Sequence, residues 1–560
     1  MCVTVVLLIN CGGKIMSKKN LIISFLLIQM ALNGIYVYLN AMVLQWTTGA
    51  LNGEVSLAFL GGVFAIQTIL SFGVSFFRVG RNYHHCTLSA MVLEKVNELE
   101  YDFFSTFSPG KLNHVRESVG DIICAIYAIV YIITDACMAI IYIVIMHHVD
   151  TFITYVTVGL YLINGLAIYL LNKASLRVSK KTTDIRRQRN IESDECINGF
   201  SDVRTYCTET RHNESVNKIT DGLINLYTKR QAIYGLMDVV ANITSGIATL
   251  LAIYIVMKNG NLLIGMPLVI YVWRLQDFMA DMIFQFGDVV QCIAVLPDFK
   301  TVMKHENKMK SGDVDLNESI DSIAIESVDF SYNKSTKILS NINMYIRKGE
   351  CIGICGGSGE GKSTLLKLLT RFYDVNAGSI KINGLNIKDL TFTSLRHRIG
   401  MVNQSPYLFD NTIRYNVTYG NPSASETEVI EACKKAGIWD FIKTLEKGLD
   451  SDVGPRGIKL SGGQEQRISI ARLFLADPEV ILLDEATSSL DNTSERIIKD
   501  AITMFRDKTI VIVAHRLTTI KDCDRIYVMN NHTIAEKGTH SQLMNLGGVY
   551  SRLYNEGKEE

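Results

Sequence analysis

The chain has 560 residues, which is enough for two or three domains. Its formal net charge is zero, so the composition gives no reason to expect nucleic acid as a partner. Apolar residues make up 48% of the chain, and they concentrate before about Asp288. We therefore expect a membrane-embedded first part and a soluble second part. The twelve cysteines include no Cys-x-x-Cys pair, which favours reduced thiols over a zinc site or a disulfide framework.

Residues 1–19 are interpreted as a cytoplasmic lead-in rather than a secretory signal. The apolar run from Val3 to Ile9 has no basic start before it and no clear cleavage site after it. Met16 is an alternative start of translation.

Six apolar stretches are each long enough to cross a bilayer, which takes about 20 residues. One such stretch could be a buried helix of a soluble protein, but six in one half of the chain argue against that explanation. They predict an all-α, six-helix transmembrane domain over residues 20–310. The stretches lie at about 20–40, 55–77, 122–146, 151–171, 233–257 and 262–284.

The connecting segments differ in charge. Lysine and arginine are abundant in 78–121 and 172–232 but absent from 41–54. Because positively charged loops stay in the cytoplasm, both basic segments and both termini are predicted to be cytoplasmic. Both segments are expected to continue the membrane helices, with chain reversals at Ser108-Pro109-Gly110 and at Gly199. These features predict an integral protein of the cell membrane.

After about Lys310 the pattern changes to short β-branched strands that alternate with helices. This pattern predicts an α/β domain with a parallel sheet over residues 311–560. Three of its expected strands are Cys351–Cys355, Val480–Leu483 and Thr509–Ala514. In open parallel sheets, binding sites form at the carboxyl ends of the strands.

The first of these strands runs into a glycine-rich loop of the form G-x-x-x-x-G-K-[ST]. Such a loop wraps its backbone N–H groups around phosphates, and the helix that follows points its positive end at them. The lysine is expected to reach the β and γ phosphates, and the serine to bind Mg²⁺. The predicted nucleotide-binding residues of the loop are Gly356, Gly357, Ser358, Gly359, Glu360, Gly361, Lys362, Ser363 and Thr364.

The other two strands also end in polar residues. Asp484 and Glu485 follow the second strand, where Asp484 is expected to hold Mg²⁺ and Glu485 to polarise an attacking water. His515 follows the third strand and is placed to contact the γ-phosphate. Solvated strand-end carboxylates and a structural histidine are the simpler explanations, but the phosphate loop at the same edge argues for function.

The segment Leu460-Ser461-Gly462-Gly463-Gln464 opens a helix between the phosphate loop and the acidic pair. Ser461 is a good N-cap, and a glycine-rich helix start can bind an anion. A simple capped helix is the alternative. The segment resembles the signature of ATP-binding-cassette (ABC) proteins.

With these motifs, nearly the whole chain resembles half-transporters of the ABC exporter family. The resemblance implies that Tyr332 stacks on adenine and that Gln404 connects Mg²⁺ and the attacking water to the membrane domain. It also implies that Asp491, in Ser489-Leu490-Asp491, lies in a loop at a dimer interface. ATP and Mg²⁺ are then the cofactors. The implied catalytic residues are Glu485, His515, Gln404 and Asp491, and the implied metal-binding residues are Ser363, Gln404 and Asp484.

The resemblance further implies a partner, because each ATP would lie between the phosphate loop of one chain and Ser461, Gly462, Gly463 and Gln464 of the other. A homodimer is favoured over a heterodimer, because the acidic pair and signature are both intact. Asp102-Phe103-Phe104 and the Gly199 region look like the two coupling regions. The chain departs from the family at Pro455, where glutamate is usual, so coupling there is expected to differ.

The function expected from these motifs is ATP-driven export of a peptide, a lipid or an amphipathic small molecule. An importer with an exporter-like fold and an ATP-gated channel or regulator are the alternatives, and intact Glu485 and His515 argue against the second. Polar residues recur at helical spacing within the spans, as expected for a central cavity. Their acidic members outnumber Arg274, which favours a cationic or amphipathic cargo. These acids are Asp135, Asp238, Asp277 and Asp281.

Overall fold

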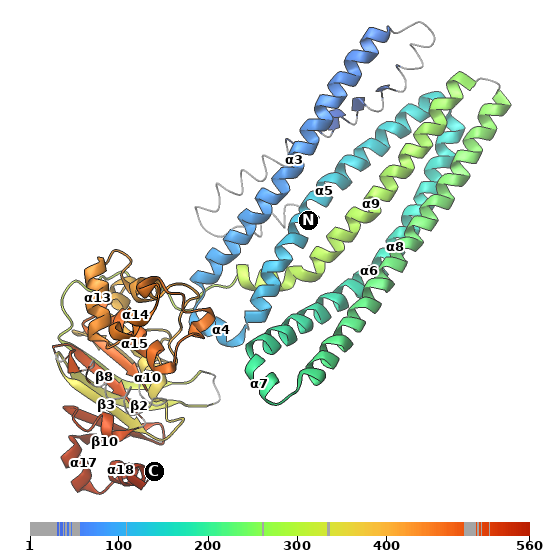
Figure 1. The fold of residues 1–560 in the computed structure, drawn as a ribbon. Coiled ribbons are helices and arrows are strands. Elements are labelled where there is room, and N and C mark those ends of the chain that lie inside the picture. Colours follow the sequence, from blue (N-terminus) through green and yellow to red (C-terminus); the bar gives the residue numbers. More distant parts are fainter. Residues whose placement is uncertain are drawn as a thin grey trace. The chain divides into compact units, whose positions relative to one another are not determined.

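The computed structural model describes residues 56–107, 109–259, 262–332, 336–485, 500, 503–505, 507–514 and 516–559, with scattered positions between 28 and 46. The chain divides into two compact units (Figure 1). A helical unit contains Met1–Leu99 and Phe103–Asn307, and an α/β unit contains Glu100–Asp102 and Lys308–Glu560.

The helical unit is built from very long helices. Four of them, α5, α6, α8 and α9, are long and apolar enough to cross a membrane, whereas the described apolar stretch of α3, Leu57–Leu70, is shorter. The first predicted span lies largely outside the described residues. The helices are α3 (Leu57–Glu98), α4 (Tyr101–Thr106), α5 (Pro109–Val149), α6 (Thr151–Asn198), α7 (Phe200–Thr205), α8 (Glu209–Asn259) and α9 (Leu262–Met303).

The helix ends follow local chemistry. Asp150 is the N-cap of α6, and its side chain accepts a hydrogen bond from the Ile153 amide at 2.9 Å. From there α6 continues for 48 residues, so the predicted extension beyond the span is indeed helical. Gly199 separates α6 from α7, and Cys207 adopts a positive φ of 51° just before α8. Helices α6 and α8 therefore run side by side, joined at one end through α7 (Figure 1).

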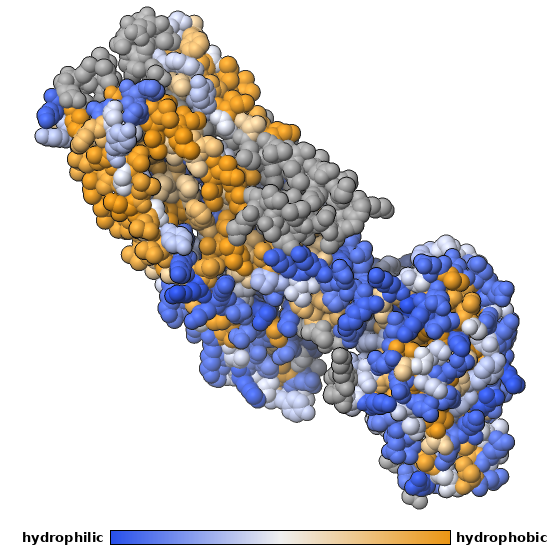
Figure 2. Space-filling view, turned by 180° about the vertical axis from the view of Figure 1, so that it is seen from behind, coloured by the Kyte–Doolittle hydropathy of each residue, from blue (hydrophilic) through white to orange (hydrophobic). Residues whose placement is uncertain are grey.

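On the face drawn in Figure 2, the middle of the helical unit is largely apolar, and hydrophilic residues gather toward its ends. Large apolar side chains are exposed along the first half of α6 and the last turns of α8. Such a continuous apolar surface is unusual for a water-soluble protein and suits contact with lipid. Examples are Leu162, Leu166 and Leu170 on α6, and Leu250, Tyr254 and Met257 on α8.

The α/β unit contains the predicted parallel sheet. Its six strands are ordered β10-β9-β3-β8-β7-β6, and all but the edge strand β10 are parallel to their neighbours. The three strands predicted to carry the site, β3, β8 and β7, are adjacent. The strands are β3 (Cys351–Gly356), β6 (Ile399–Val402), β7 (Val480–Asp484), β8 (Thr509–Val513), β9 (Arg525–Asn530) and β10 (Thr533–Gly538).

A second, antiparallel sheet has the strand order β2-β1-β4-β5. Alternate residues of the parallel strands point to opposite faces of the parallel sheet. Ile354 and Leu482 join the buried cluster shared with the antiparallel sheet, whereas Cys355 and Leu483 join the cluster under the helices. The strands of the second sheet are β1 (Ser322–Phe330), β2 (Leu339–Arg347), β4 (Ala377–Ile382) and β5 (Leu385–Asn386).

The helices of the α/β unit are short compared with those of the helical unit. The longest of those described, α15, begins within the predicted signature segment. They are α10 (Lys362–Leu369), α11 (Phe392–Arg398), α12 (Ile413–Val417), α13 (Glu426–Lys435), α14 (Trp439–Thr444), α15 (Gly462–Ala476), α17 (His540–Leu546) and α18 (Val549–Glu559).

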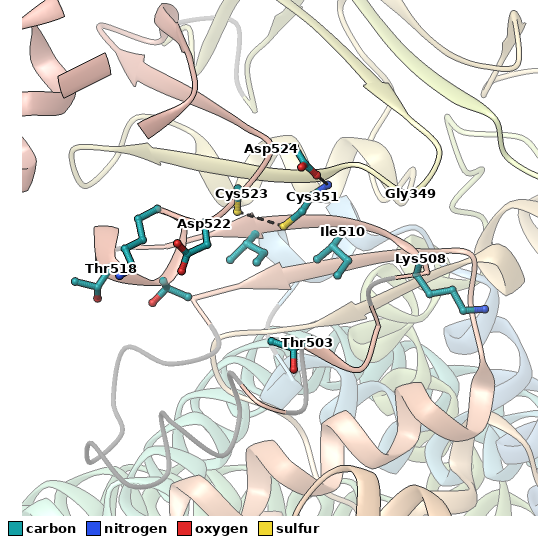
Figure 3. A pocket seen from close by; sticks show the side chains of 12 residues that line it. Gly349, Cys351, Thr503, Lys508, Ile510, Thr518, Asp522, Cys523 and Asp524 are labelled. Carbon is teal, nitrogen blue, oxygen red and sulfur yellow. Dashed lines mark hydrogen bonds between the residues drawn. The ribbon is translucent and has the colours of Figure 1, made fainter. Parts of the chain in front are cut away.

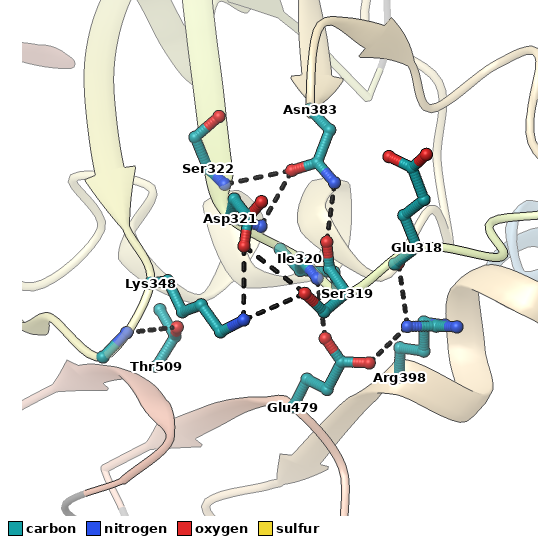
Figure 4. Close-up of polar contacts among 11 residues, drawn as sticks. Glu318, Ser319, Ile320, Asp321, Ser322, Lys348, Asn383, Arg398, Glu479 and Thr509 are labelled. Atoms are coloured by element: carbon teal, nitrogen blue, oxygen red, sulfur yellow. Dashed lines mark hydrogen bonds and ion pairs between the residues drawn. The ribbon is translucent and has the colours of Figure 1, made fainter.

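A polar network fixes the segment that enters β1 (Figure 4). The Glu479 carboxylate forms an ion pair with Arg398 and accepts a hydrogen bond from the Ile320 amide at 2.6 Å. The Asn383 side-chain oxygen accepts hydrogen bonds from the amides of Asp321 and Ser322 at 2.8 and 3.1 Å. The network therefore ties the start of the antiparallel sheet to the start of β7 in the parallel sheet.

Candidate active site

The phosphate loop lies between β3 and α10, as predicted. Gly356, Gly359 and Gly361 all have positive φ angles, of 150°, 84° and 92°. A side chain at Gly356 would place its Cβ 2.3 Å from the Met529 carbonyl oxygen, so this position has no room for one. Sequence and backbone geometry therefore agree on the loop.

Lys362 is the first residue of α10, and its side chain folds back over the loop. Its Nζ donates to the carbonyl oxygens of Gly356 and Gly357, at 2.9 and 2.8 Å. Burial lowers the pKa of this ammonium group. The loop thus holds a cation, partly removed from water, beside its own backbone.

The acidic pair lies at the same edge of the sheet, at the end of β7. Asp484 is 7% exposed, and its Oδ1 accepts a hydrogen bond from Ser363 Oγ at 2.8 Å. Burial raises the pKa of Asp484, although the bond from Ser363 opposes that shift. The two proposed metal-binding oxygens are therefore brought together by residues 121 positions apart in the chain.

Glu485 is held on both its backbone and its side chain. Its φ is +49°, a conformation uncommon for residues other than glycine, and its amide donates to the Val513 carbonyl of β8 at 3.0 Å. Its carboxylate accepts a hydrogen bond from Gln404 Nε2 at 2.7 Å. The structure thus joins Gln404 and Glu485, which the sequence suggested separately.

Tyr332 and Thr364 also meet. The Tyr332 hydroxyl lies 2.9 Å from Thr364 Oγ1, in the first turn of α10. The Tyr332 ring packs edge-on against Tyr373, with ring centroids 5.1 Å apart. Tyr332 remains 41% exposed, so its ring is free to take a further stacking partner.

Glu360 has a different setting from the rest of the loop. Its carboxylate accepts a hydrogen bond from the His532 amide at 2.7 Å, in the turn between β9 and β10. This residue therefore supports the loop from outside. Gly357 and Ser358 lie in the turn between β3 and α10.

The signature segment begins α15. Ser461 is the N-cap, and its side chain and that of Gln464 form a reciprocal capping box, with the Ser461 amide donating to Gln464 Oε1 at 2.8 Å. Gly462 is exposed and Gly463 is buried in the first turn. Within the chain, then, this helix start is satisfied by its own side chains. His515 and Asp491 lie outside the described residues.

Three residues near the site were not singled out by the sequence analysis. Gln466 is 2% exposed and donates to the Gln404 carbonyl oxygen at 3.4 Å, so it supports the loop that bears Gln404. Tyr101 stacks on Phe372, with centroids 5.3 Å apart, and also meets Tyr373. Nothing local in the sequence marks Gln466, Tyr101 or Tyr373 as neighbours of the site.

Comparisons with known proteins agree with this geometry. Residues 20–273 match the ABC transporter transmembrane region, and residues 339–488 match the ABC transporter family. The chain belongs to the ABC transporter family. Because four of its described helices are long and apolar enough to cross a membrane, this transporter is an integral membrane protein.

Curated relatives of this ABC transporter include proteins of Staphylococcus aureus strains NCTC 8325 and Mu50 that carry the name multidrug export ATP-binding/permease protein. Each is 50% identical over 235 residues, which is 42% of this chain and 41% of the relative. The match thus spans about two fifths of the length of these relatives. A solved structure, of a bacterial Atm1-family ABC exporter with ATP bound, has the same fold. It aligns with a TM-score of 0.81 and 24% identity over 95% of this chain and 97% of that one.

Proposed function

We propose that this ABC transporter is one half of a dimeric exporter that hydrolyses ATP to move its cargo out of the cell. The observation that carries the proposal is the Ser363–Asp484 and Gln404–Glu485 pairing beside a phosphate loop, in a chain that also contains membrane-crossing helices. The names of the S. aureus relatives support export as the direction. We place the α/β unit and both termini in the cytoplasm at the cell membrane.

The site fits ATP and Mg²⁺. Lys362 and Asp484 are both charged groups that burial disfavours, and a ligand of opposite charge would relieve each of them. Ser363 and Asp484 offer the oxygen ligands that Mg²⁺ prefers. We assign Mg²⁺ to these two residues and Gln404, where it would neutralise phosphate charge.

Within this proposal each residue has a separate task. The Lys362 ammonium and the loop amides bind the phosphates, and Tyr332 stacks on the adenine. Glu485 orients and polarises the attacking water, and Gln404 holds the Glu485 carboxylate in place. His515 contacts the γ-phosphate, while Ser461 and Asp491 serve the nucleotide across the dimer.

The cargo path is proposed for a cavity of about 450 Å³ in the helical unit. Arg274 lies 3.4 Å from Asp277, so these two charges offset each other and Asp281 adds a further acid. Tyr142 and Phe278 add aromatic surface. This lining suits a cationic, amphipathic cargo. The described lining residues are Tyr36, Met138, Tyr142, Arg274, Asp277, Phe278, Ala280 and Asp281.

Purified protein reconstituted into sealed vesicles tests the proposal. ATP added outside the vesicles reaches only those transporters whose α/β unit faces outward. For these we expect ATP hydrolysis and uptake of a cationic amphipathic dye such as ethidium into the vesicle, which corresponds to export from a cell. Dye leaving those vesicles instead would support an importer. Ionic current without ATP turnover would support a channel. The absence of both dye movement and ATP hydrolysis would contradict the proposal.

A further inference from the structure

Two cysteines in the α/β unit lie against each other, far along the chain from one another. Cys351 Sγ and Cys523 Sγ are 3.2 Å apart and are joined by a hydrogen bond (Figure 3). They are separated by 172 positions in sequence. Among the described cysteines, no other pair has a sulfur–sulfur hydrogen bond.

The backbone around the pair is fixed. Cys351 begins β3, and Cys523 lies just before β9, which is the parallel neighbour of β3. The Asp524 amide donates to the Cys351 carbonyl at 2.9 Å, and the Cys351 amide donates to Asp524 Oδ2 at 2.8 Å. A disulfide has an S–S distance of about 2.05 Å, so the sulfurs need to approach by about 1 Å, which side-chain rotation can supply.

Both cysteines line a cavity of about 690 Å³, together with the exposed residues Thr518 and Asp522 (Figure 3). Cys351 is partly exposed, whereas Cys523 is 7% exposed. A hydrogen bond donated by the Cys523 thiol to the Cys351 sulfur lowers the pKa of Cys351, which favours the reactive thiolate at the more accessible sulfur.

We propose that Cys351 and Cys523 form a reversible intramolecular disulfide when small-molecule disulfides accumulate around the protein. The Cys351 thiolate attacks one sulfur of a disulfide RS–SR, forms a mixed disulfide and releases RS⁻. The Cys523 sulfur, after losing its proton to water, then attacks Cys351 Sγ and releases the second RS⁻. Two protein thiols are thereby oxidised, and one RS–SR is reduced to two thiols.

The position of the two cysteines indicates that a disulfide between them would affect the stability of the α/β unit rather than the phosphate loop. Cys351 is at the start of β3, whereas the phosphate loop begins at the opposite end of that strand, at Gly356. The crosslink therefore forms at the edge of the sheet remote from the nucleotide. It joins two distant parts of the chain, which restricts the unfolded state, so the oxidised α/β unit is expected to resist unfolding.

The test uses the full-length protein in detergent, incubated with oxidised glutathione, alkylated and digested for mass spectrometry. We expect the Cys351 peptide to be linked to the Cys523 peptide, and dithiothreitol to release it. Oxidation is expected to raise the unfolding midpoint of the α/β unit by about 5 °C.

Three variants serve as controls. Cys351→Ser and Cys523→Ser should lose both the link and the thermal shift, while Cys433→Ser, at a buried cysteine without a sulfur partner, should retain both. The proposal would be overturned if Cys351 of the unaltered protein carried glutathione or were oxidised to a sulfinic or sulfonic acid while Cys523 was alkylated as a free thiol. The same thermal shift in Cys523→Ser would also overturn it.

Discussion

At the residue scale, the most consequential contact joins Gln404 to Glu485. Glu485 combines a positive φ with a backbone hydrogen bond to β8 and a side-chain bond to Gln404, so its carboxylate has little freedom. An uncommon backbone conformation at a proposed reaction centre is typical of residues positioned for chemistry. The neighbouring Asp484 has no such strain and is instead held by Ser363.

We predict that Glu485→Gln reduces ATP hydrolysis by about 100-fold or more while ATP binding remains. The amide preserves the size of the side chain and a bond to Gln404 but cannot accept a proton from water. Steady-state phosphate release and fluorescent-nucleotide binding measure the two effects. Glu431→Gln, at an exposed position of α13, is the matched control and should behave as the unaltered protein. Hydrolysis near the normal rate in Glu485→Gln would remove this residue from the mechanism.

Lys362 is predicted to contribute to the affinity for ATP and not only to its hydrolysis. Lys362→Ala deletes the ammonium group that now bonds to Gly356 and Gly357, and we expect ATP affinity to fall by about 10- to 100-fold. Equilibrium binding of a labelled ATP analogue checks this. Lys381→Ala, which removes a surface ion pair with Glu326, should leave affinity unchanged. Equal affinity in all three proteins would show that ATP binds elsewhere.

At the element scale, the sequence was most informative for strands in which an apolar run leads directly into residues of the proposed nucleotide site. The strands β3, β7 and β8 are apolar runs, of which β3 ends in glycine and β7 in aspartate, and each was predicted within a residue or two of its observed bounds. The bond between Ser363 and Asp484 followed from parallel strands that end at one edge. The strands themselves depend on residues that are close in sequence, whereas the contact between Ser363 and Asp484 depends only on both strand ends meeting at one side of the sheet.

Features created by distant contacts were not predictable in the same way. The antiparallel sheet depends on pairing between β1 and β4, which are far apart in sequence, and nothing local in either strand indicates its partner. Tyr101 belongs to the α/β unit although it begins α4, because its ring stacks on Phe372. Nothing in the sequence near Tyr101 indicates that partner. The predicted turn at Ser108-Pro109-Gly110 is tested only in part, since α5 begins at Pro109 and Ser108 is outside the described residues.

Three helices in the α/β unit begin with the same capping box, which allows a controlled test of the signature helix. The caps are Ser425 on α13, Ser461 on α15 and Thr539 on α17. Replacing each by alanine should lower the free energy of unfolding by about 1 kcal/mol. Only Ser461→Ala is predicted to reduce ATP hydrolysis as well. Thermal unfolding measures the change in stability, and phosphate release measures ATP hydrolysis. Equal hydrolysis in all three variants would show that Ser461 only caps its helix.

At the scale of the whole molecule, the proposed site is incomplete within one chain. The capping box satisfies Ser461 within its own helix, and the contact proposed for it is with nucleotide bound to a second subunit. We predict that this chain, expressed alone, assembles into a homodimer and hydrolyses ATP. Light scattering in detergent should give twice the protein mass of one chain. A monomer that gains activity only with a different subunit would contradict the homodimer.

The final prediction concerns the cavity in the helical unit, where charge decides which cargo can bind. Arg274 and Asp277 are within 3.4 Å of each other, so Asp281 leaves the described lining with one more acid than base. Burying a cation beside unpaired acids costs less than burying an anion there, and Tyr142 and Phe278 can face its apolar part. Asp277→Asn and Asp281→Asn should therefore each abolish stimulation of ATP hydrolysis by a cationic dye and leave the basal rate within about twofold, because the reaction site lies in the other unit.

Two further variants sharpen that experiment. Asp221→Asn, at an exposed position of α8 outside the predicted span, should retain full stimulation. Asp238, also on α8, was predicted to face the path but is not among the described residues that line this cavity. Loss of stimulation in Asp238→Asn would extend the path to α8, whereas normal stimulation would confine it to the cavity between α5 and α9. Full stimulation in both Asp277→Asn and Asp281→Asn would place the cargo elsewhere.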